Sequence, residues 1–214
     1  MRLGIFVPAA ILAAAVNASA STILVANLTN SQENPPTTPT LTGGAPRPAS
    51  FGTAQFFIND AMTFMTFTAT IFNIDVTGSQ TADVNDNLVA AHIHAGANLP
   101  PLNNPVVWGF FGAPFNDNNP NDFLFTPFAT GVGGTFSGKW DAPEGNGTTL
   151  LLQLPNILAG RAYINFHTTQ FGGGEIRGAI TAVPEPTSLL LLGMGGLGLI
   201  AKLRNRRKKI QAPA

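Results

Sequence analysis

The three histidines of the chain are the residues whose type and spacing could do chemistry. His92 and His94 lie one residue apart in "LVAAHIHAG" (88–96), and His167 lies in "AYINFHT" (162–168). Alternate residues of a strand share one face, so the first two histidines would point the same way. Two imidazoles placed in this way can bind one metal ion, and three suit Zn²⁺ or Cu²⁺. The spacing therefore indicates a metal half-site that a third histidine would complete.

A hairpin is expected to bring further polar residues to the same face. The glycine-rich link "TQFGGG" predicts that the strands on either side of it pair with each other. Such pairing would place His167 near Glu175, and Asn165 near Arg177. Either a carboxylate or a water molecule would complete the metal coordination. The predicted metal set is His92, His94, His167 and Glu175.

A structural role for the histidines is the alternative. The imidazoles would then form hydrogen bonds with Glu175, Asn165 or backbone groups and hold two strands together. Arg177 and Glu175 would form a cross-strand ion pair. The chain has no G-x-S-x-G elbow, and its carboxylate pairs lie only in expected loops. The sequence therefore predicts a non-enzymatic binding or structural module, with a metal-dependent protein or enzyme as the alternative.

Strands, rather than helices, are expected to position these residues. Only 10% of the residues are charged, and the chain has 23 glycines, 17 prolines and 16 phenylalanines. Runs rich in Thr, Phe, Val and Ile, separated by Gly, Pro and Asn clusters, are typical of strands. The expected strands are 22–28, 52–59, 62–72, 88–94, 104–111, 134–140, 148–154, 162–168 and 174–181, with a helical turn at 155–160. This pattern predicts an all-β, Greek-key-like antiparallel β-sandwich. The chain has no cysteine, which excludes disulfides and thiolate metal sites.

The first twenty residues are expected to be a secretory signal peptide. Arg2 precedes an apolar run, and "ASA" at 18–20 supplies the small residues that a signal peptidase requires. Cleavage is predicted between Ala20 and Ser21. The exported domain would then span residues 21–182.

The exported part of the chain is acidic. Residues 21–183 contain four Lys or Arg and ten Asp or Glu, a net charge of −6. This balance argues against nucleic acid as a partner, because phosphate binding needs a basic surface. The loops 83–87 and 116–122 carry oxygen ligands of the kind calcium prefers, although Asn and Asp clusters also form ordinary turns.

The C-terminus contains three elements in a fixed order. Pro184, Glu185 and Pro186 are followed by an apolar span at 187–203, expected as a hydrophobic transmembrane helix, and by a basic tail at 202–209. This order resembles the PEP-CTERM sorting signal, and the resemblance covers residues 183–209. It implies a Gram-negative exported protein, anchored transiently in the inner membrane with its domain in the periplasm and processed by an exosortase-type enzyme. It also implies a place at the cell surface or in the extracellular matrix, with exopolysaccharide or surface proteins as partners.

Four short motifs occur in a fixed order in the exported part of the chain. They are "NSQENPP" (30–36), "AAHIHAG" (90–96), "LAGRAYINFHT" (158–168) and "GGGEIRGAI" (172–180). This series resembles the CHRD (chordin-type) domain over about residues 22–181. The resemblance implies a β-sandwich in an exported protein, and no known reaction. The H-x-H element is also loosely similar to the copper/zinc superoxide dismutase sandwich, although three histidines cannot fill that enzyme's site. Residues 97–135 match none of the motifs.

Overall fold

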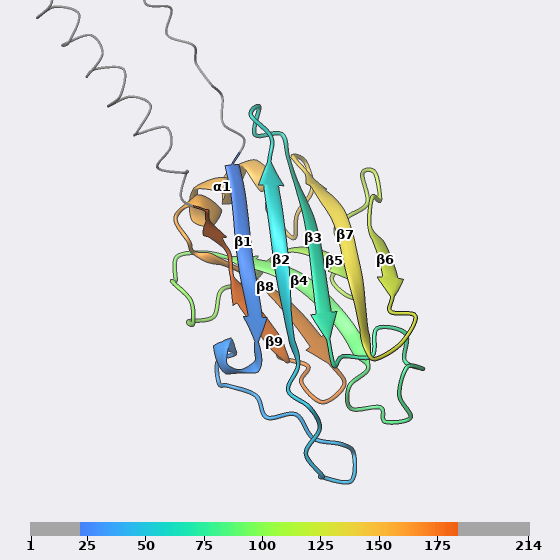
Figure 1. Ribbon diagram of the computed structural model, residues 1–214. Coiled ribbons are helices and arrows are strands. Elements are labelled where there is room, and N and C mark those ends of the chain that lie inside the picture. Colours follow the sequence, from blue (N-terminus) through green and yellow to red (C-terminus); the bar gives the residue numbers. More distant parts are fainter. Residues whose placement is uncertain (1–21, 184–214) are drawn as a thin grey trace, which may run out of the picture.

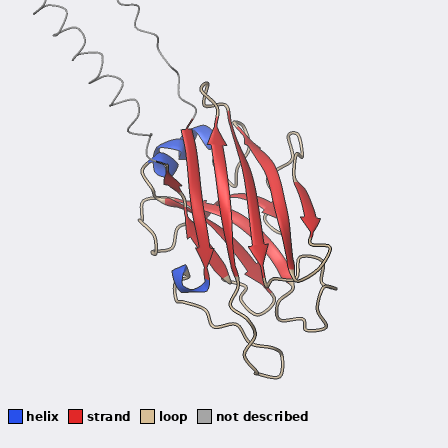
Figure 2. Ribbon diagram, viewed as in Figure 1, coloured by secondary structure: helices blue, strands red, loops and turns tan. Residues whose placement is uncertain are grey.

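Residues 22–183 are the part of the chain that the computed structural model describes, and they form ten strands, one short α-helix and one 3-10 turn. The elements are β1 (Thr22–Thr29), η1 (Asn30–Gln32), β2 (Phe51–Ile58), β3 (Phe64–Phe72), β4 (Leu88–Ala95), β5 (Val106–Phe111), β6 (Leu124–Pro127), β7 (Gly133–Asp141), α1 (Leu150–Leu158), β8 (Ala162–Thr168), β9 (Ile176–Ala179) and β10 (Thr181–Ala182). Strands dominate the described chain throughout (Figure 2). The expected all-β class is confirmed.

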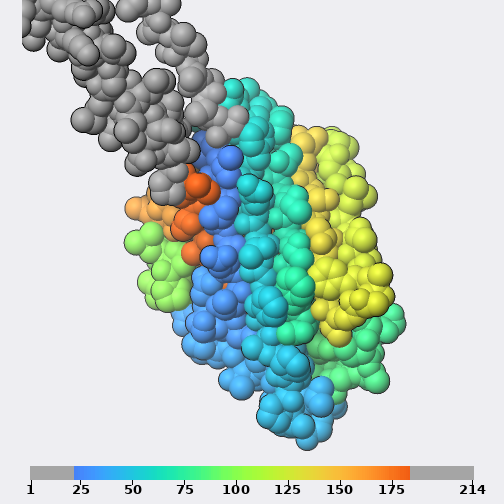
Figure 3. All heavy atoms as spheres, viewed as in Figure 1, coloured from blue at the N-terminus to red at the C-terminus, as the bar shows by residue number. Residues whose placement is uncertain are grey.

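The strands form one sheet that curls into two layers. The order is β5-β4-β8-β9-β1-β2-β3-β7-β6, with β10 paired to β1, and all the pairs of named strands are antiparallel. Figure 1 shows β1, β2, β3, β7 and β6 in front, with β4, β5, β8 and β9 crossing behind them. The space-filling view shows the front strands as adjoining bands of one continuous face (Figure 3). The link between β9 and β1 is where the sheet turns from one layer into the other.

The core lies between the layers and follows from strand alternation. In β2 every second residue is buried, and Phe56 is 1% exposed. Inward-facing aromatic side chains from both layers meet there, including the Trp108 and Trp140 rings, which stack with centroids 5.5 Å apart. Phe67 packs edge-on against Trp108 and also contacts Phe110. Each such ring, when fully buried, contributes about 1.5–3 kcal/mol to the free energy of unfolding.

Two predicted features of the secondary structure are corrected. Residues 148–154 were expected to form a strand, but Leu150–Leu158 is α1. Thr149 caps this helix by accepting a hydrogen bond from the amide of Leu152, and the buried side chains recur at helical spacing. A continuous apolar run fits a buried strand and a half-buried helix equally well, which explains the error. Strand β6 falls in the stretch where no strand was expected.

Strands β4 and β8 differ from the others because both of their faces are covered. All seven residues of β8 are buried, as are seven of the eight in β4. The core covers one face, and loops from three parts of the chain cover the other. Polar residues on that outer face are therefore withdrawn from solvent, which is the setting of the histidines.

The terminal segments lie outside the described residues. They include the expected signal peptide with its cleavage site at Ala20 and Ser21, the motif Pro184–Pro186 and the hydrophobic helix at 187–203. Within residues 22–183, no helix is long and apolar enough to cross a membrane.

Candidate functional site

The three histidines meet on the outer face of β4 and β8. In the ladder between these strands His92 pairs with Asn165, and His94 pairs with Tyr163. The ring centroids of His92 and His167 are 4.8 Å apart, and those of His94 and His167 are 6.0 Å apart. One nitrogen from each ring lies within 4.8 Å of the other two. The exposed fractions are 4%, 8% and 6% for His92, His94 and His167, so the cluster is buried.

The second nitrogen of each ring contacts a backbone carbonyl oxygen from a different loop. His92 Nε2 lies 3.0 Å from the oxygen of Ala113, and His94 Nδ1 lies 2.9 Å from that of Asn104. His167 Nδ1 lies 3.1 Å from the carbonyl oxygen of Gly172. A carbonyl only accepts hydrogen bonds, so each of these nitrogens must carry the ring proton. The lone pairs therefore sit on His92 Nδ1, His94 Nε2 and His167 Nε2.

No proton lies between the lone pairs of His92 and His167, and the lone pair of His94 has no donor within the described chain. His92 Nδ1 and His167 Nε2 are 3.1 Å apart, and His94 Nε2 is buried without a hydrogen-bond partner among the described residues. Burial is the main cause that lowers the pKa of His94 to about 3 and that of His167 to about 4. Burial also lowers the pKa of His92. At neutral pH the cluster is uncharged and rich in lone pairs, an arrangement that a metal cation would satisfy.

Gly109 of β5 allows the loop at 113–114 to approach His92. A Cβ atom at position 109 would lie 1.8 Å from the carbonyl oxygen of Pro114 and 2.9 Å from His92 Cδ2. The pairing of β4 with β5 also shifts register between Ala91 and His92 and again between Ile93 and His94. Such bulges redirect side chains next to functional sites. The absent side chain and the bulges together set the position of the His92 ring.

Glu175 does not join the histidines, and its predicted place is corrected. It is 0% exposed, and its carboxylate accepts hydrogen bonds from Arg47 Nη2, Ser50 Oγ and Thr168 Oγ1. The reason is local, because Gly174 has a φ of 126° and β9 begins only at Ile176. Strand alternation therefore does not extend to Glu175, whose side chain meets that of Thr168 instead of that of His167.

Arg177 pairs with Glu33 and not with Glu175, which corrects the predicted cross-strand ion pair. Its Nε and Nη2 lie 2.9 and 2.8 Å from Glu33 Oε2. The guanidinium also donates to the oxygens of Pro101 and Asn103, and it lies 4.2 Å from the centroid of the Tyr163 ring. Glu33 belongs to the "NSQENPP" motif, but its partner is 144 residues away. The motif could be recognised in the sequence, but nothing in it indicated that Glu33 pairs with Arg177.

Replacing Arg177 by lysine is expected to lower the free energy of unfolding by about 1.5–3 kcal/mol, the usual worth of hydrogen bonds to charged groups. An ammonium cannot reproduce the forked contacts to Glu33, Asn103 and Pro101. Urea denaturation measures the change. Arg161→Lys, at an exposed arginine, is the matched control and should leave the free energy unchanged. Equal effects of the two variants would contradict the role given to Arg177.

Asn165 lies between the histidines and this ion pair. It faces His92 on one neighbouring strand and Arg177 on the other. It is 1% exposed, and neither its amide nitrogen nor its amide oxygen has a hydrogen-bond partner in the described chain. A buried primary amide without partners is costly, so this position suits a bound water or ligand.

The carboxylates of the acidic loops bind amides and a lysine of the protein itself. The carboxylate of Asp83 accepts from the amides of Thr42 and Asn85, as in an ordinary turn. Near the second loop, Lys139 Nζ lies 2.9 Å from Asp122 Oδ2 and 3.2 Å from Asp141 Oδ2. In the described residues, the only group of three or more potential ligands within metal-binding distance is the histidine cluster. The turn interpretation of these loops fits the structure better than calcium binding.

An antiparallel β-sandwich with a buried three-histidine cluster on two adjacent strands is thus the class of module that the geometry defines. The family model described as the CHRD domain matches residues 24–180, and the chain belongs to this family. A second model, the PEP-CTERM protein-sorting motif, matches residues 182–208. The chain is therefore an exported protein that an exosortase-type system sorts. No curated protein and no solved structure gives a significant match to the chain.

Proposed function

We propose that this exported protein is a non-enzymatic surface module whose CHRD domain binds one Zn²⁺ or Cu²⁺ ion through His92 Nδ1, His94 Nε2 and His167 Nε2. The observation that carries the proposal is that one nitrogen from each of the three rings lies within 4.8 Å of the other two, while a backbone carbonyl accepts from one nitrogen of each ring. Without a cation, the lone pairs of His92 and His167 face each other at 3.1 Å, which is unfavourable. A metal ion converts this repulsion into coordination.

The surroundings of the cluster suit a metal centre. Metal-bound histidines usually donate their other ring N–H to a carbonyl or carboxylate, which orients the ring and fixes its tautomer. Here three carbonyls have that role. Imidazole ligands favour zinc and copper over calcium or magnesium. Water would fill the fourth position, with the unpartnered amide of Asn165 as its hydrogen-bonding neighbour.

A structural role for the ion fits the burial of the site. The ion would tie β4 to β8, and through the ring N–H groups it would hold the loops that carry Ala113, Asn104 and Gly172. These loops cover the outer face of the back layer. The domain would then present a fixed loop surface to a partner at the cell surface or in the matrix, either another surface protein or exopolysaccharide. The sorting signal supports that location.

Elemental analysis of the purified chain, residues 21–214, tests the metal. One zinc or copper per chain is expected, and the doubly substituted variant His92→Ala/His94→Ala should lose it. At a metal concentration a hundredfold above the dissociation constant, the ion should add about 2.7 kcal/mol to the free energy of unfolding. A metal-free, folded chain whose melting temperature ignores added zinc and copper would refute the proposal. Arg161→Ala, at an exposed residue, is the control for metal lost during purification.

A metal-dependent enzyme is the second candidate, because a three-histidine site keeps a coordination position for substrate or water. Turnover by the metal-loaded chain that His92→Ala abolishes would favour it. The burial of all three rings, at 4–8% exposure, supports the non-enzymatic role instead.

A further inference from the structure

The outward face of α1 is apolar, which is unusual for the exposed side of a surface helix. Leu150, Leu154 and Ile157 pack against the core. On the other side, Leu151 is 62% exposed and Leu152 is 67% exposed. The helix contains no charged residue. Its exposed leucines therefore form a small apolar surface with no partner in the described chain.

This apolar face lies at the end of the domain where the chain leaves for the sorting signal. Strand β10 packs against α1 and pairs with β1, and the amide of Val183 donates to the carbonyl of Ile23 at 3.0 Å. Val183, which directly follows β10, is 45% exposed and adds an apolar side chain at this end of the domain. Figure 1 shows α1 close to the points where both ends of the described chain leave the domain.

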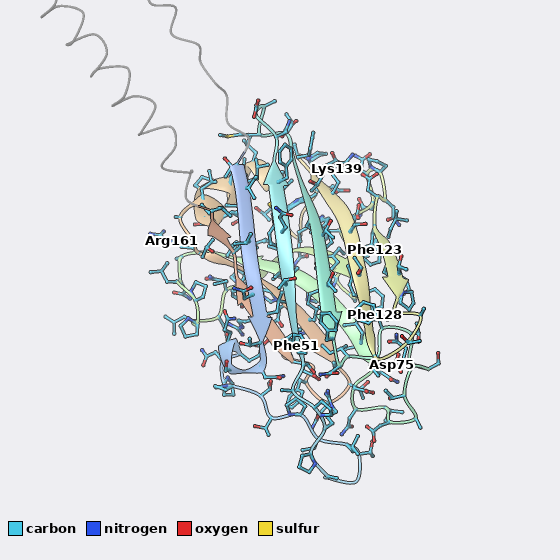
Figure 4. All side chains as sticks on the ribbon, viewed as in Figure 1. Phe51, Asp75, Phe123, Phe128, Lys139 and Arg161 are labelled. Atoms are coloured by element: carbon cyan, nitrogen blue, oxygen red, sulfur yellow. The ribbon has the colours of Figure 1, made fainter. Side chains whose placement is uncertain are left out.

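The chain beyond Ala182 holds this end close to any membrane that the tail enters. The first leucine of the apolar span is Leu189, so only the six residues 183–188 separate it from β10. Fully extended, they reach at most about 20 Å. Arg161, an exposed residue just after α1, lies on the same side of the molecule (Figure 4) and could pair with anionic lipid headgroups.

We infer that the surface formed by Leu151, Leu152, Leu158 and Val183, called here the α1 patch, lies in the headgroup region of the membrane while the tail is inserted. The tether length keeps the patch near the lipid, and burial of its leucines favours the docked orientation. In that orientation the loops at the opposite end of the sandwich project away from the membrane. The inference depends on the sorting signal and not on the histidine site, so either can fail without the other.

Single-cysteine labelling tests this orientation, because the natural chain has no cysteine. The chain of residues 21–214 is reconstituted in phosphatidylethanolamine/phosphatidylglycerol vesicles with an environment-sensitive fluorophore at Leu151→Cys. We expect nitroxide-labelled lipids to quench this fluorophore and aqueous iodide to have little access to it. Leu124→Cys is the matched control, since this leucine is 69% exposed on edge strand β6, across the front layer from β1. Its fluorophore should be open to iodide and insensitive to the lipid quencher.

A second pair of samples distinguishes the effect of the apolar patch from that of attachment through the tail. With the fluorophore moved to Leu158→Cys, adding Leu151→Ser and Leu152→Ser should restore access to iodide while the tail keeps the chain on the vesicles. Equal quenching of the 151 and 124 positions by iodide would overturn the inference. Protection of the 151 position in lipid-free solution would also overturn it, because a second copy or the chain's own tail would then cover the patch.

Discussion

Replacing Glu175 by alanine is expected to lower the free energy of unfolding by about 3–5 kcal/mol, the usual cost of removing one partner of a buried ion pair. The side chain of Arg47 is only 4% exposed, and it would be left charged and without its carboxylate. Ser50 and Thr168 would also lose their acceptor. Urea denaturation measures the loss, and elemental analysis should show the metal content of the folded variant unchanged.

The isosteric variant Glu175→Gln separates charge from shape. Ser50 and Thr168 donate to different oxygens of Glu175, so the single amide oxygen of glutamine can accept from only one of them. The variant also removes the negative charge opposite Arg47, and its stability should fall between those of the alanine variant and the natural chain. The double variant Arg47→Met/Glu175→Met should be more stable than the sum of the single changes predicts, because the pair is in direct contact. The alternative outcome is a Glu175→Gln variant that is as stable as the natural chain and yet loses the metal. That result would place Glu175 in the metal site, as the sequence predicted.

Acid is expected to destabilise the metal-free chain strongly. The folded state keeps His94 and His167 neutral down to a pKa of about 3 and about 4, whereas the unfolded chain protonates them near 6.5. Between these values the unfolded state binds more protons, so the free energy of unfolding is highest above pH 6.5 and falls as the pH drops. The slope is about 1.4 kcal/mol per pH unit for each histidine. Urea titrations in the presence of a chelator measure it.

Three carboxyl groups of the described chain act in the opposite direction, because burial raises the pKa of Glu33, Asp86 and Asp117, and Asp117 is the one controlled here. Burial is the main cause that raises the pKa of Asp117 to about 6, so its contribution to stability grows as the pH falls through that value. Asp117→Asn removes this contribution and should steepen the acid loss. His167→Gln removes one of the titrating histidines, so the free energy of unfolding should fall less steeply with pH, by about 1.4 kcal/mol per pH unit. A free energy of unfolding that is constant from pH 7 to pH 5 in the Asp117→Asn chain would contradict the neutral, buried cluster.

Some elements were predictable because their signals are local. In β2 and β3 the alternation of apolar and polar residues by itself indicates which face is buried, and both strands form as expected. The "HIH" pattern places two imidazoles on one face of β4 for the same reason. In 148–154 the signal was ambiguous, and the residues form a helix. No local pattern indicated β6 either, where two of the four residues are Thr and Pro.

The sequence by itself determined the class of the fold, the family, the exported fate and the side of the sheet that carries each histidine. These depend on alternation, motif order and terminal composition, which are properties of neighbouring residues. Only the tertiary structure decided the partners, since Glu33 and Arg177 are 144 residues apart and Arg47 and Glu175 are 128 apart. It also decided which nitrogen of each imidazole holds its lone pair. That choice depends on the loop carbonyl each ring meets, and no sequence spacing encodes the direction of a carbonyl.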